Sequence, residues 1–475
     1  MFQAIASQGI MTSNDLKLAQ SIASVKEQLS KDAQLLVGSQ IEQNLLTDFL
    51  GHNIGHASFY VKVANAQDVQ KLVSWAAANK ISITVRGAGT NLVGSTIPKG
   101  GLIIDVSALN RILELDEVNR TIVVEPGVLL SDLQAYVEAK GLFYPPDPAE
   151  KHASIGGNIA TNAGGMRAVK YGVTRDYVLA LEVVTAQGKL MTLGSKCLKD
   201  STGLNLKHLF IGSEGSLGVI TKCTLRLIDK PEFTGHALIG FKSLSEAILS
   251  VNEIKHALLE PTAIEFIERK VIALGESFVG KSFPLPDSKA YLLVTFDGKQ
   301  EQVLERLNLC QQVLKIQHEI EYLPLNDGEI AANVWLVRSA LAKAVQASGM
   351  WEPVDTVVPL SAISTFVDYV AELSNKTGVR ILPFGHAGDG NVHLCILKDS
   401  LSDELWGETL DHILSSLYHR VYELKGKIAA EHGLGRNKRK YFLAEVNQDE
   451  LALMRSVKAA IDPNNLFNPQ SGYAN

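Results

Sequence analysis

The sequence has few cysteines and no long hydrophobic run. Four cysteines occur in 475 residues, at positions 197, 223, 310 and 395, and no two of them form a CxxC pair. Their scarcity and spacing exclude a disulfide framework and a cysteine-based zinc or iron–sulfur site. No stretch approaches the roughly 18 apolar residues that cross a bilayer, and the N-terminus lacks the basic start and apolar run of a secretion signal. We therefore expect a cytoplasmic protein that does not span a membrane, with a peripheral position at the inner membrane face as the alternative.

Basic residues do not dominate the chain either. Lysine and arginine number 45 against 51 aspartates and glutamates, which gives a net charge of −6. A mildly acidic chain is poorly suited to bind nucleic acid or anionic lipid. Apolar residues make up 46% of the sequence and charged residues 20%, a composition that excludes intrinsic disorder. Since a single core rarely grows past roughly 300 residues, a chain of this length predicts at least two cores.

Periodic patterns divide the chain near residue 229. Before that point, helical spacing predicts helices over 13–50, after a cap at Asn65 and Asp68, and over 131–140, while strand-like runs lie at 81–85, 102–106, 121–124, 177–185 and 189–193. Beyond it, helical stretches at 245–259, 300–318 and 361–377 alternate with strand-like runs at 290–295, 379–384 and 392–397. This alternation predicts a second layered domain of helices and strands, followed by a mainly helical tail over 440–475.

Glycine is clustered in three short segments, at 87–94, 154–165 and 212–220. The first is not a dinucleotide fingerprint, because the third glycine would fall at Leu92 and no helix follows. Glycine lets main-chain N–H groups come close to a ligand, and successive N–H groups form an anion nest. Two such loops suit a diphosphate held from both sides, whereas each alone is as easily an ordinary tight turn.

Several segments resemble the FAD-linked oxidases of the vanillyl-alcohol-oxidase or PCMH type. The matching segments are RGAGT (86–90), PPDPA (145–149), IGGNIATNAGG (155–165), KYGVTRDYV (170–178) and GSEGSLGVIT (212–221), and GHAGDGNVH (385–393) and EHGLG (431–435) match the D-2-hydroxyacid dehydrogenase branch. The resemblance implies an α+β fold. It implies an N-terminal helical segment (1–40), a PCMH-type FAD-binding domain (41–229), a substrate cap domain on an antiparallel sheet (230–430), and a C-terminal segment with helices that returns to the FAD domain (431–475).

The same resemblance implies FAD as cofactor, with its pyrophosphate between the first two glycine segments. The residues implied in FAD binding are Arg86, Gly87, Ala88, Gly89, Thr90, Asn91, Pro146, Asp147, Ser154, Gly156, Gly157, Thr161, Gly164, Gly165, Val219, Ile220 and Asn468. Relatives that attach the flavin covalently often have a histidine where Thr90 stands, so the resemblance implies non-covalent FAD. Ala149 and Glu150 depart from the two serines of many relatives.

His386 and His393 flank a glycine-rich turn between two strand-like segments. Cross-strand neighbours have Cβ atoms about 5 Å apart, so the two imidazoles could share a cation or be hydrogen-bonded structural histidines. Glu431 is the acidic candidate for a third ligand, and two histidines with one carboxylate suit Zn²⁺, Mn²⁺ or Fe²⁺. Relatives in this branch bind a divalent metal at these three positions, so the resemblance implies a metal site at His386, His393 and Glu431.

Two further residues are candidates for catalysis. A histidine is well suited to take a proton from a hydroxyl group near neutral pH. His432 would point away from Glu431 in an extended segment, whereas in an irregular loop it can face the substrate. Arg338 ends a WxxR segment, Trp335 to Arg338, and the resemblance implies that its guanidinium holds the substrate carboxylate. The alternative for both residues is a structural or surface role.

Departures from the family pattern bear on the substrate. Pro353 stands where relatives specific for 2-hydroxyglutarate have a lysine, and Cys395 stands where they have an asparagine. We therefore expect a small D-2-hydroxyacid such as D-lactate, with glycolate or D-2-hydroxyglutarate as alternatives. A metallohydrolase and a flavin-loaded electron-transfer subunit without its own substrate are the alternatives of another class.

Other sequence features bear on the path of the electrons. The chain has no clustered cysteines and no NAD fingerprint. The expected acceptor is therefore external: an electron-transferring flavoprotein, an iron–sulfur subunit, a quinone or a cytochrome. The basic run at 436–440 is interpreted as a solvated face, with FAD phosphates or an acidic electron-transfer partner as the alternative counter-charges.

Overall fold

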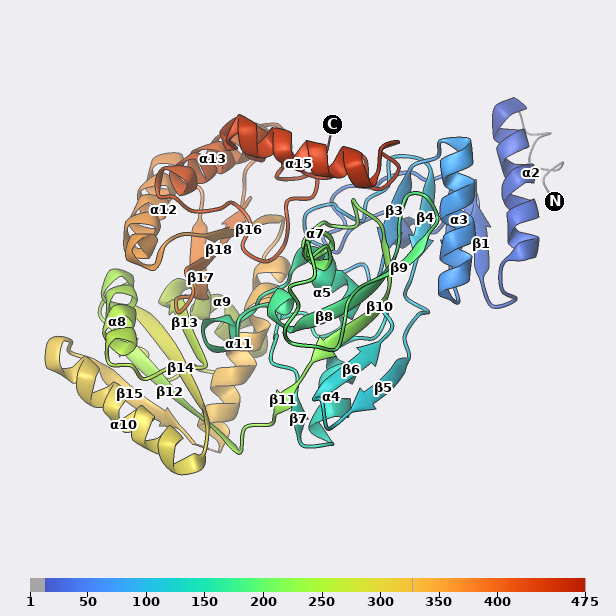
Figure 1. Ribbon diagram of the computed structural model, residues 1–475. Helices are drawn as coiled ribbons and strands as arrows, with labels where there is room; N and C mark the ends of the chain where they lie inside the picture. Colours follow the sequence, from blue (N-terminus) through green and yellow to red (C-terminus); the bar gives the residue numbers. More distant parts are fainter. Residues whose placement is uncertain (1–12, 327, 475) are drawn as a thin grey trace.

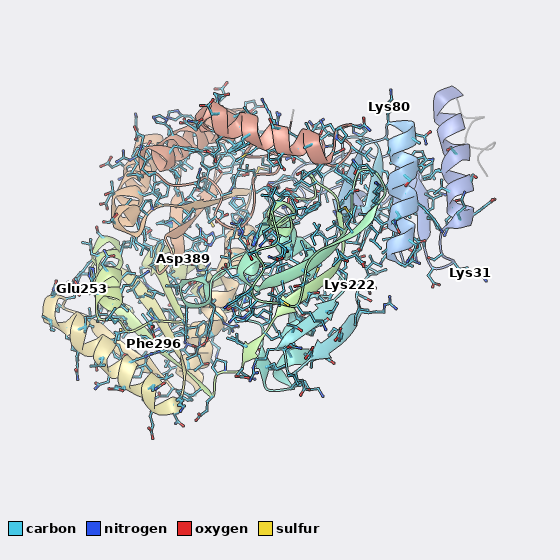
Figure 2. All side chains as sticks on the ribbon, viewed as in Figure 1. Lys31, Lys80, Lys222, Glu253, Phe296 and Asp389 are labelled. Carbon is cyan, nitrogen blue, oxygen red and sulfur yellow. The ribbon has the colours of Figure 1, made fainter. Side chains whose placement is uncertain are left out.

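The structure is a computed structural model that describes residues 13–326 and 328–474. Figure 1 shows two halves side by side, with the glycine-rich half on the right and the cap on the left. The C-terminal helix α15 (Gln448–Ile461) lies along the top of the molecule. Asp389, in the turn that precedes residues 391–397, is labelled in the left half of the view in Figure 2. This turn meets the glycine-rich half directly, since a Cβ on Gly388 would lie 2.8 Å from a methyl group of Val169.

Two sheets form the glycine-rich half. A four-stranded sheet has the order β1–β2–β4–β3, and an antiparallel five-stranded sheet has the order β5–β6–β10–β8–β9. The strands are β1 (Gln34–Val37), β2 (Phe59–Lys62), β3 (Ile83–Arg86), β4 (Leu102–Asp105), β5 (Ile112–Asp116), β6 (Thr121–Val124), β8 (Val178–Val184), β9 (Leu190–Gly194) and β10 (Val219–Arg226), and the short strands β7 (Leu142–Phe143) and β11 (Ile228–Asp229) pair with each other. The helices are α2 (Ser13–Gln28), α3 (Ala66–Asn79), α4 (Leu130–Glu138), α5 (Ile155–Thr161), α6 (Ala168–Tyr171) and α7 (Lys207–Phe210).

The local sequence signals predicted about half of these elements: α2, α3, α4, β3, β4, β6, β8 and β9. The helix after Asn65 is confirmed as α3, and the Asn65 side chain accepts a hydrogen bond from the N–H of Asp68 at 2.8 Å. The hairpin around Gly188 is confirmed as β8 and β9. The prediction of helix over 13–50 is wrong beyond Gln28, because residues 34–37 pair as a strand with Phe59–Lys62. The expected segment 1–40 lies partly outside the described residues.

The cap is built on a seven-stranded antiparallel sheet in the order β15–β12–β14–β13–β17–β18–β16. Its strands are β12 (Phe233–Phe241), β13 (Ala263–Glu268), β14 (Ala290–Gly298), β15 (Glu321–Leu325), β16 (Trp351–Val357), β17 (Ile381–His386) and β18 (Asn391–Leu397). Side chains alternate between two cores along each strand. In β14, Leu292 and Val294 belong to one core, while Tyr291 and Leu293 belong to the other. An antiparallel cap sheet is thus confirmed.

Helices cover both faces of the cap sheet. The helices α8 (Leu244–His256), α10 (Gln300–Gln317), α12 (Ile363–Thr377) and α13 (Asp403–Glu423) pack on the outer face. The helices α9 (Arg269–Val279) and α11 (Glu329–Ala347) pack on the opposite face, which is turned toward the glycine-rich half (Figure 1). Helix α11 contains the WxxR segment, for which the sequence analysis assigned no helix.

After α14 (Arg439–Glu445) and α15, the chain returns to the glycine-rich half. The N–H of Ile83 donates to the carbonyl of Leu466 at 2.8 Å, and the N–H of Asn468 donates to the carbonyl of Ile83 at 2.7 Å. The tail therefore docks on β3, the strand that leads into the first glycine segment. Within the described part of the chain, no helix combines the length and hydropathy that a membrane crossing requires.

Candidate functional site

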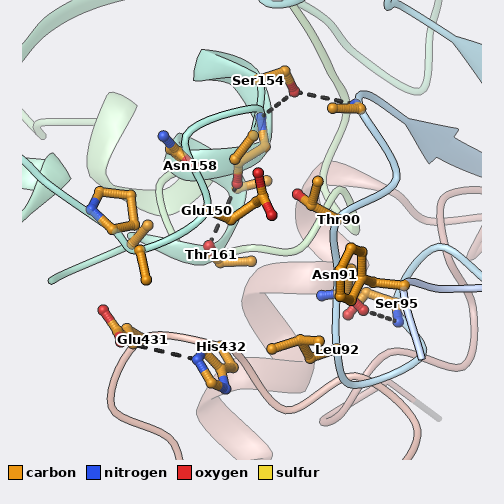
Figure 3. Close-up of a pocket in the computed structure, with 18 of the residues that line it drawn as sticks. Thr90, Asn91, Leu92, Ser95, Glu150, Ser154, Asn158, Thr161, Glu431 and His432 are labelled. Atoms are coloured by element: carbon orange, nitrogen blue, oxygen red, sulfur yellow. Dashed lines mark hydrogen bonds and ion pairs between the residues drawn. The ribbon is translucent and has the colours of Figure 1, made fainter. Parts of the chain in front are cut away.

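A cavity of about 600 Å³ lies between the two halves. One wall consists of the first two glycine segments, and the other consists of α11 together with residues of β16, β17, β18 and the loop at 431–432. Ligand pockets in proteins commonly have roughly 300–1,000 Å³. In Figure 3 Thr90 and Thr161 face Glu431 and His432 across this space. The cavity therefore brings together segments that are far apart in the sequence.

The glycine segments approach each other closely, but the second is not a loop. Residues 155–161 form the short helix α5, and the side chain of Ser154 caps it. Ser154 Oγ accepts hydrogen bonds from the N–H of Ala88 at 3.4 Å and from the N–H of Gly157 at 3.3 Å (Figure 3). A Cβ on Gly87 would lie 2.4 Å from Ser154 Oγ, so this contact requires glycine at position 87.

Eleven of the seventeen residues expected to bind FAD line the cavity. They are Gly87, Ala88, Gly89, Thr90, Asn91, Asp147, Ser154, Gly156, Gly157, Thr161 and Ile220. Four of these eleven residues are glycines, whose main chain a diphosphate can approach closely. The residues present on this wall therefore fit the phosphate and ribityl part of FAD.

The other six residues lie behind the wall or beside it. Arg86 donates hydrogen bonds to the carbonyls of Asn44 and Thr47, and Asn468 donates to the carbonyls of Ser95 and Glu214. The carbonyl of Pro146 accepts a hydrogen bond from Gln134, and Val219 is part of a hydrophobic core. Gly165 forms a β-bridge with Asp147, and Gly164 adjoins Glu431. These contacts hold the wall in place. Direct contact of these six residues with FAD stays a prediction.

The two histidines of the glycine-rich turn meet inside the cavity. In the register of β17 and β18, His386 is opposite Asn391 and His393 is opposite Phe384, so the two histidines are diagonal rather than direct partners. Their Nε2 atoms are nevertheless 3.4 Å apart, and their rings are perpendicular. Two imidazole nitrogens at this distance can share a hydrogen bond or bind one cation.

Glu431 completes a set of three donor atoms. Its Oε1 lies 3.4 Å from His393 Nε2 and 3.8 Å from His386 Nε2. Its Oε2 is buried and has no hydrogen-bond partner among the described residues. Ligands about 2.1 Å from a tetrahedral zinc ion lie about 3.4 Å from one another. The three side chains therefore fit a divalent metal, and the unpartnered oxygen is a second observation in favour of a cation.

Asp355 lies in the same cluster, but both of its carboxylate oxygens already accept hydrogen bonds. Its Oδ2 accepts hydrogen bonds from the N–H groups of Ala430, Glu431 and His432 at 2.9–3.0 Å, and its Oδ1 accepts one from Asn391 at 2.9 Å. Asp355 is therefore better suited to hold the loop than to bind a metal. The sequence analysis did not single out this residue.

The sequence analysis interpreted the basic run at 436–440 as a solvated face, but part of the run is buried. Lys438 is buried, and its Nζ donates to the carbonyls of Asp355 and Ile428 at 3.0 and 2.9 Å. These bonds tie the start of the loop at 428–435 to the cap sheet. Burial lowers the pKa of Lys438, while the nearby carboxylate of Asp355 opposes that shift.

Glu265 connects the metal candidates to Arg338. It is directly opposite His386 in the pairing of β13 with β17, is 1% exposed, and accepts hydrogen bonds from His386 Nδ1 and Arg338 Nη2. Burial alone would raise the pKa of Glu265, but the charges of His386 and Arg338 bring it to about 2. A carboxylate behind a histidine fixes the ring with Nε2 free for a metal.

Two predicted catalytic residues line the same cavity. Arg338 is anchored by Glu265, and its buried Nε has no hydrogen-bond partner among the described residues. The loop at 431–432 is irregular, so His432 and Glu431 both face the cavity (Figure 3). The ring of His432 stacks on that of His393, with centroids 5.6 Å apart, and its Nδ1 lies 3.9 Å from Asp355 Oδ2.

Comparisons with known proteins agree with this arrangement. Residues 57–194 match the family model described as "FAD binding domain", and residues 230–471 match "FAD linked oxidases, C-terminal domain". The chain is 36% identical over 447 residues to "D-lactate dehydrogenase" of Anaerostipes hadrus, which covers 92% of this chain and 94% of that protein. It is 35% identical over 417 residues to "Glycolate oxidase subunit GlcD" of Bacillus subtilis, which covers 86% of this chain and 87% of that protein. It is 33% identical over 443 residues to "D-2-hydroxyglutarate dehydrogenase" of Stutzerimonas stutzeri, covering 90% and 93%.

The solved structure of p-cresol methylhydroxylase with substrate bound has the same fold. The TM-score is 0.81 at 16% identity, with 98% of each chain covered. Both halves of the fold thus have counterparts in this solved structure. The chain belongs to the FAD-linked oxidases of the PCMH type, and it is an FAD-linked oxidoreductase.

Proposed function

We propose that the protein is an FAD-dependent dehydrogenase of a small D-2-hydroxyacid, D-lactate, with glycolate and D-2-hydroxyglutarate as the alternative substrates. One observation carries the proposal. The wall opposite the glycine segments combines an anchored guanidinium, a set of two histidines and a carboxylate, and a third histidine. A 2-hydroxyacid offers one group to each of these: a carboxylate, a hydroxyl oxygen and a hydroxyl proton. The names of the relatives point to the same class of substrate.

The residues have separate roles in this proposal. FAD, when bound, supplies the acceptor for the hydride on C2 of the substrate. Arg338, anchored by Glu265, binds the substrate carboxylate. His386, His393 and Glu431 would hold a divalent metal, which would make the 2-hydroxyl more acidic. His432, whose backbone Asp355 fixes, takes the hydroxyl proton.

FAD is expected to be bound without a covalent link. Thr90 lines the cavity where covalently flavinylated relatives often have a histidine, so this position has no imidazole to form the link. Acid precipitation of the purified protein should release all of the flavin into the supernatant, measured by its absorbance. Flavin that stays on the washed pellet would contradict this prediction.

The far end of the substrate is expected to lie near an apolar pair. Pro353 and Cys395 are direct partners in the pairing of β16 with β18, and both line the cavity. Proline is tolerated here because β16 is an edge strand. Neither side chain can pair with a second carboxylate, and burying such a charge unpaired costs several kcal/mol. Substrates with a short, uncharged side chain therefore suit this wall.

Dye-coupled steady-state kinetics test this specificity. We expect kcat/KM for D-lactate to exceed that for D-2-hydroxyglutarate by at least about tenfold, or 1.4 kcal/mol. The double variant P353K/C395N should narrow or reverse that ratio, because it introduces a cation and an amide at the paired positions. A preference for D-2-hydroxyglutarate in the unaltered enzyme would refute the assignment and point to Lys343, which also lines the cavity.

The reduced flavin must pass its electrons to an acceptor outside this chain, since the sequence has neither clustered cysteines nor an NAD fingerprint. We infer a protein partner: an electron-transferring flavoprotein, an iron–sulfur subunit or a cytochrome, with a quinone as the alternative. Turnover of D-lactate should be slow with NAD⁺ or O₂ and fast with an artificial dye. Reduction of O₂ at the dye-supported rate would identify an oxidase instead.

A further inference from the structure

A second cavity of about 350 Å³ adjoins the first. It lies where α6 and the strand β7 of the glycine-rich half meet the sheet of the cap. Asp147, Met166 and Trp335 line both cavities, so a single layer of side chains separates them. Trp335 precedes Arg338 by three positions on α11 and lies between the two spaces. The proposed FAD and substrate contacts do not use this second cavity.

The carboxylates on the wall of the second cavity are all balanced by cations or a hydroxyl group. The pairs are Glu138 with Lys230 at 2.8 Å, Asp147 with Lys151 and with Arg167 at 3.5 Å, and Asp297 with Lys170 and with the Tyr171 hydroxyl at 3.0 Å. A cation entering this space would therefore find no free carboxylate. The unpartnered polar atoms of this wall are a guanidinium nitrogen and a hydroxyl group, and both can donate a hydrogen bond.

Two buried donors on this wall have no partner. Arg167 Nη1 and Thr262 Oγ1 form no hydrogen bond with any described residue, and Thr262 is 2% exposed. Arg167 is held in place, since its guanidinium lies over the ring of Phe143 at 4.9 Å and contacts Asp147. Leaving a buried polar group unsatisfied costs about 1–3 kcal/mol, and more for a charged group. A ligand that accepts hydrogen bonds would remove both costs.

The same wall also contains a histidine, His236. His236 Nδ1 is within hydrogen-bond distance of Thr295 Oγ1 at 2.9 Å, and its ring contacts Trp335 edge-on at 4.9 Å. Burial, with the charge of Arg167 added, lowers the pKa of His236 to about 4. Lys230 on this wall is paired with Glu138. Arg167 contacts Asp147 through Nη2 and keeps Nη1 without a partner among the described residues, so it is the cation left to hold a ligand, and a guanidinium matches a carboxylate.

We propose that the second cavity binds a small carboxylate of the substrate or product class, held by Arg167 and Thr262 one side-chain layer away from the flavin cavity. The class of ligand rests on the proposed function. The site itself rests on the two unpartnered donors, which no role in the redox reaction explains. A carboxylate here would contact Trp335 from the side opposite the first cavity.

Calorimetry on the FAD-loaded enzyme tests the proposal with 2-hydroxyisobutyrate, which has no hydrogen on C2 and cannot be oxidised. We expect two binding sites per chain. R338M should remove the first site, and T262V should weaken the second about tenfold, as the loss of a hydrogen bond to a charged group does. T262V removes only an unpartnered hydroxyl group, so the melting temperature should not fall. R167M should abolish the second site.

The matched control is T185V, which also removes a buried hydroxyl group without a partner among the described residues, but away from both cavities. It should bind the probe as the unaltered enzyme does. A single site that R338M abolishes, with no effect of T262V or R167M, would overturn this proposal and leave the proposed function standing. Two sites in a protein whose flavin no 2-hydroxyacid reduces would overturn the proposed function and leave the second site standing.

Discussion

Replacing His432 by asparagine is expected to lower kcat for D-lactate by about 10²–10⁴-fold, the usual contribution of a general base. Asparagine keeps the approximate size and the backbone hydrogen bond to Asp355, but it cannot take a proton. Because Arg338 and the glycine segments are untouched, FAD content and KM should change little. Stopped-flow flavin reduction measures this step directly.

The control for this variant is H419N. His419 is 61% exposed in its side chain, pairs with Glu423 and Glu445 at the surface, and does not line the cavity. It should reduce its flavin at the rate of the unaltered enzyme. If H432N keeps more than a tenth of the normal rate, His432 is not the base.

Loss of either histidine of the proposed metal site is expected to have the second large effect. H386A or H393A should lower the bound divalent metal to well under one equivalent and lower turnover by more than about 100-fold, with FAD retained. The comparison is the E265Q variant, which keeps all three donors but weakens the support of His386 and the anchor of Arg338. Loss of support behind a metal ligand usually costs about 10–100-fold. Elemental analysis by mass spectrometry and the flavin absorbance of the same samples measure metal and FAD separately.

The order of effects tests the assignment of roles. The ligand variants should lose more metal than E265Q, and H419A should lose none. A chelated, metal-free enzyme with full activity would show that the His386, His393 and Glu431 cluster is structural. In that case the unpartnered Oε2 of Glu431 would need another explanation.

Local sequence signals predicted that the two histidines on the cap side of the cavity lie close together. His386 and His393 flank a turn between two strands, and that pattern alone indicated that they approach each other. Glu265 was missed because its partners are distant in sequence, 73 residues away at Arg338 and 121 at His386. The available signal was a glutamate between two apolar residues, Ile264 and Phe266, in the strand β13. Asp355 was missed for the same reason.

The errors in secondary structure have local causes. Residues 34–37 were included in the helix expected over 13–50, but short apolar runs do not distinguish helix from strand, and β1 forms through its pairing with β2. The glycines at 156 and 157 predicted a loop, whereas the cap by Ser154 starts the helix α5 there. In α11, Val334, Val337 and Leu341 are buried at helical spacing. The sequence analysis interpreted this segment only as the WxxR motif and did not assign the helix.

Anaerobic mixing with D-lactate tests the central claim most directly, because it observes the flavin of this chain and no external acceptor. We predict that the oxidised flavin bleaches within the turnover time, that deuterium at C2 slows the bleaching, and that L-lactate reduces it far more slowly. Each result follows if a cavity with Arg338 and His432 presents C2 of a D-2-hydroxyacid to FAD. A flavin that stays oxidised with D-lactate, glycolate and D-2-hydroxyglutarate would contradict the account and favour an electron-transfer subunit without a substrate of its own.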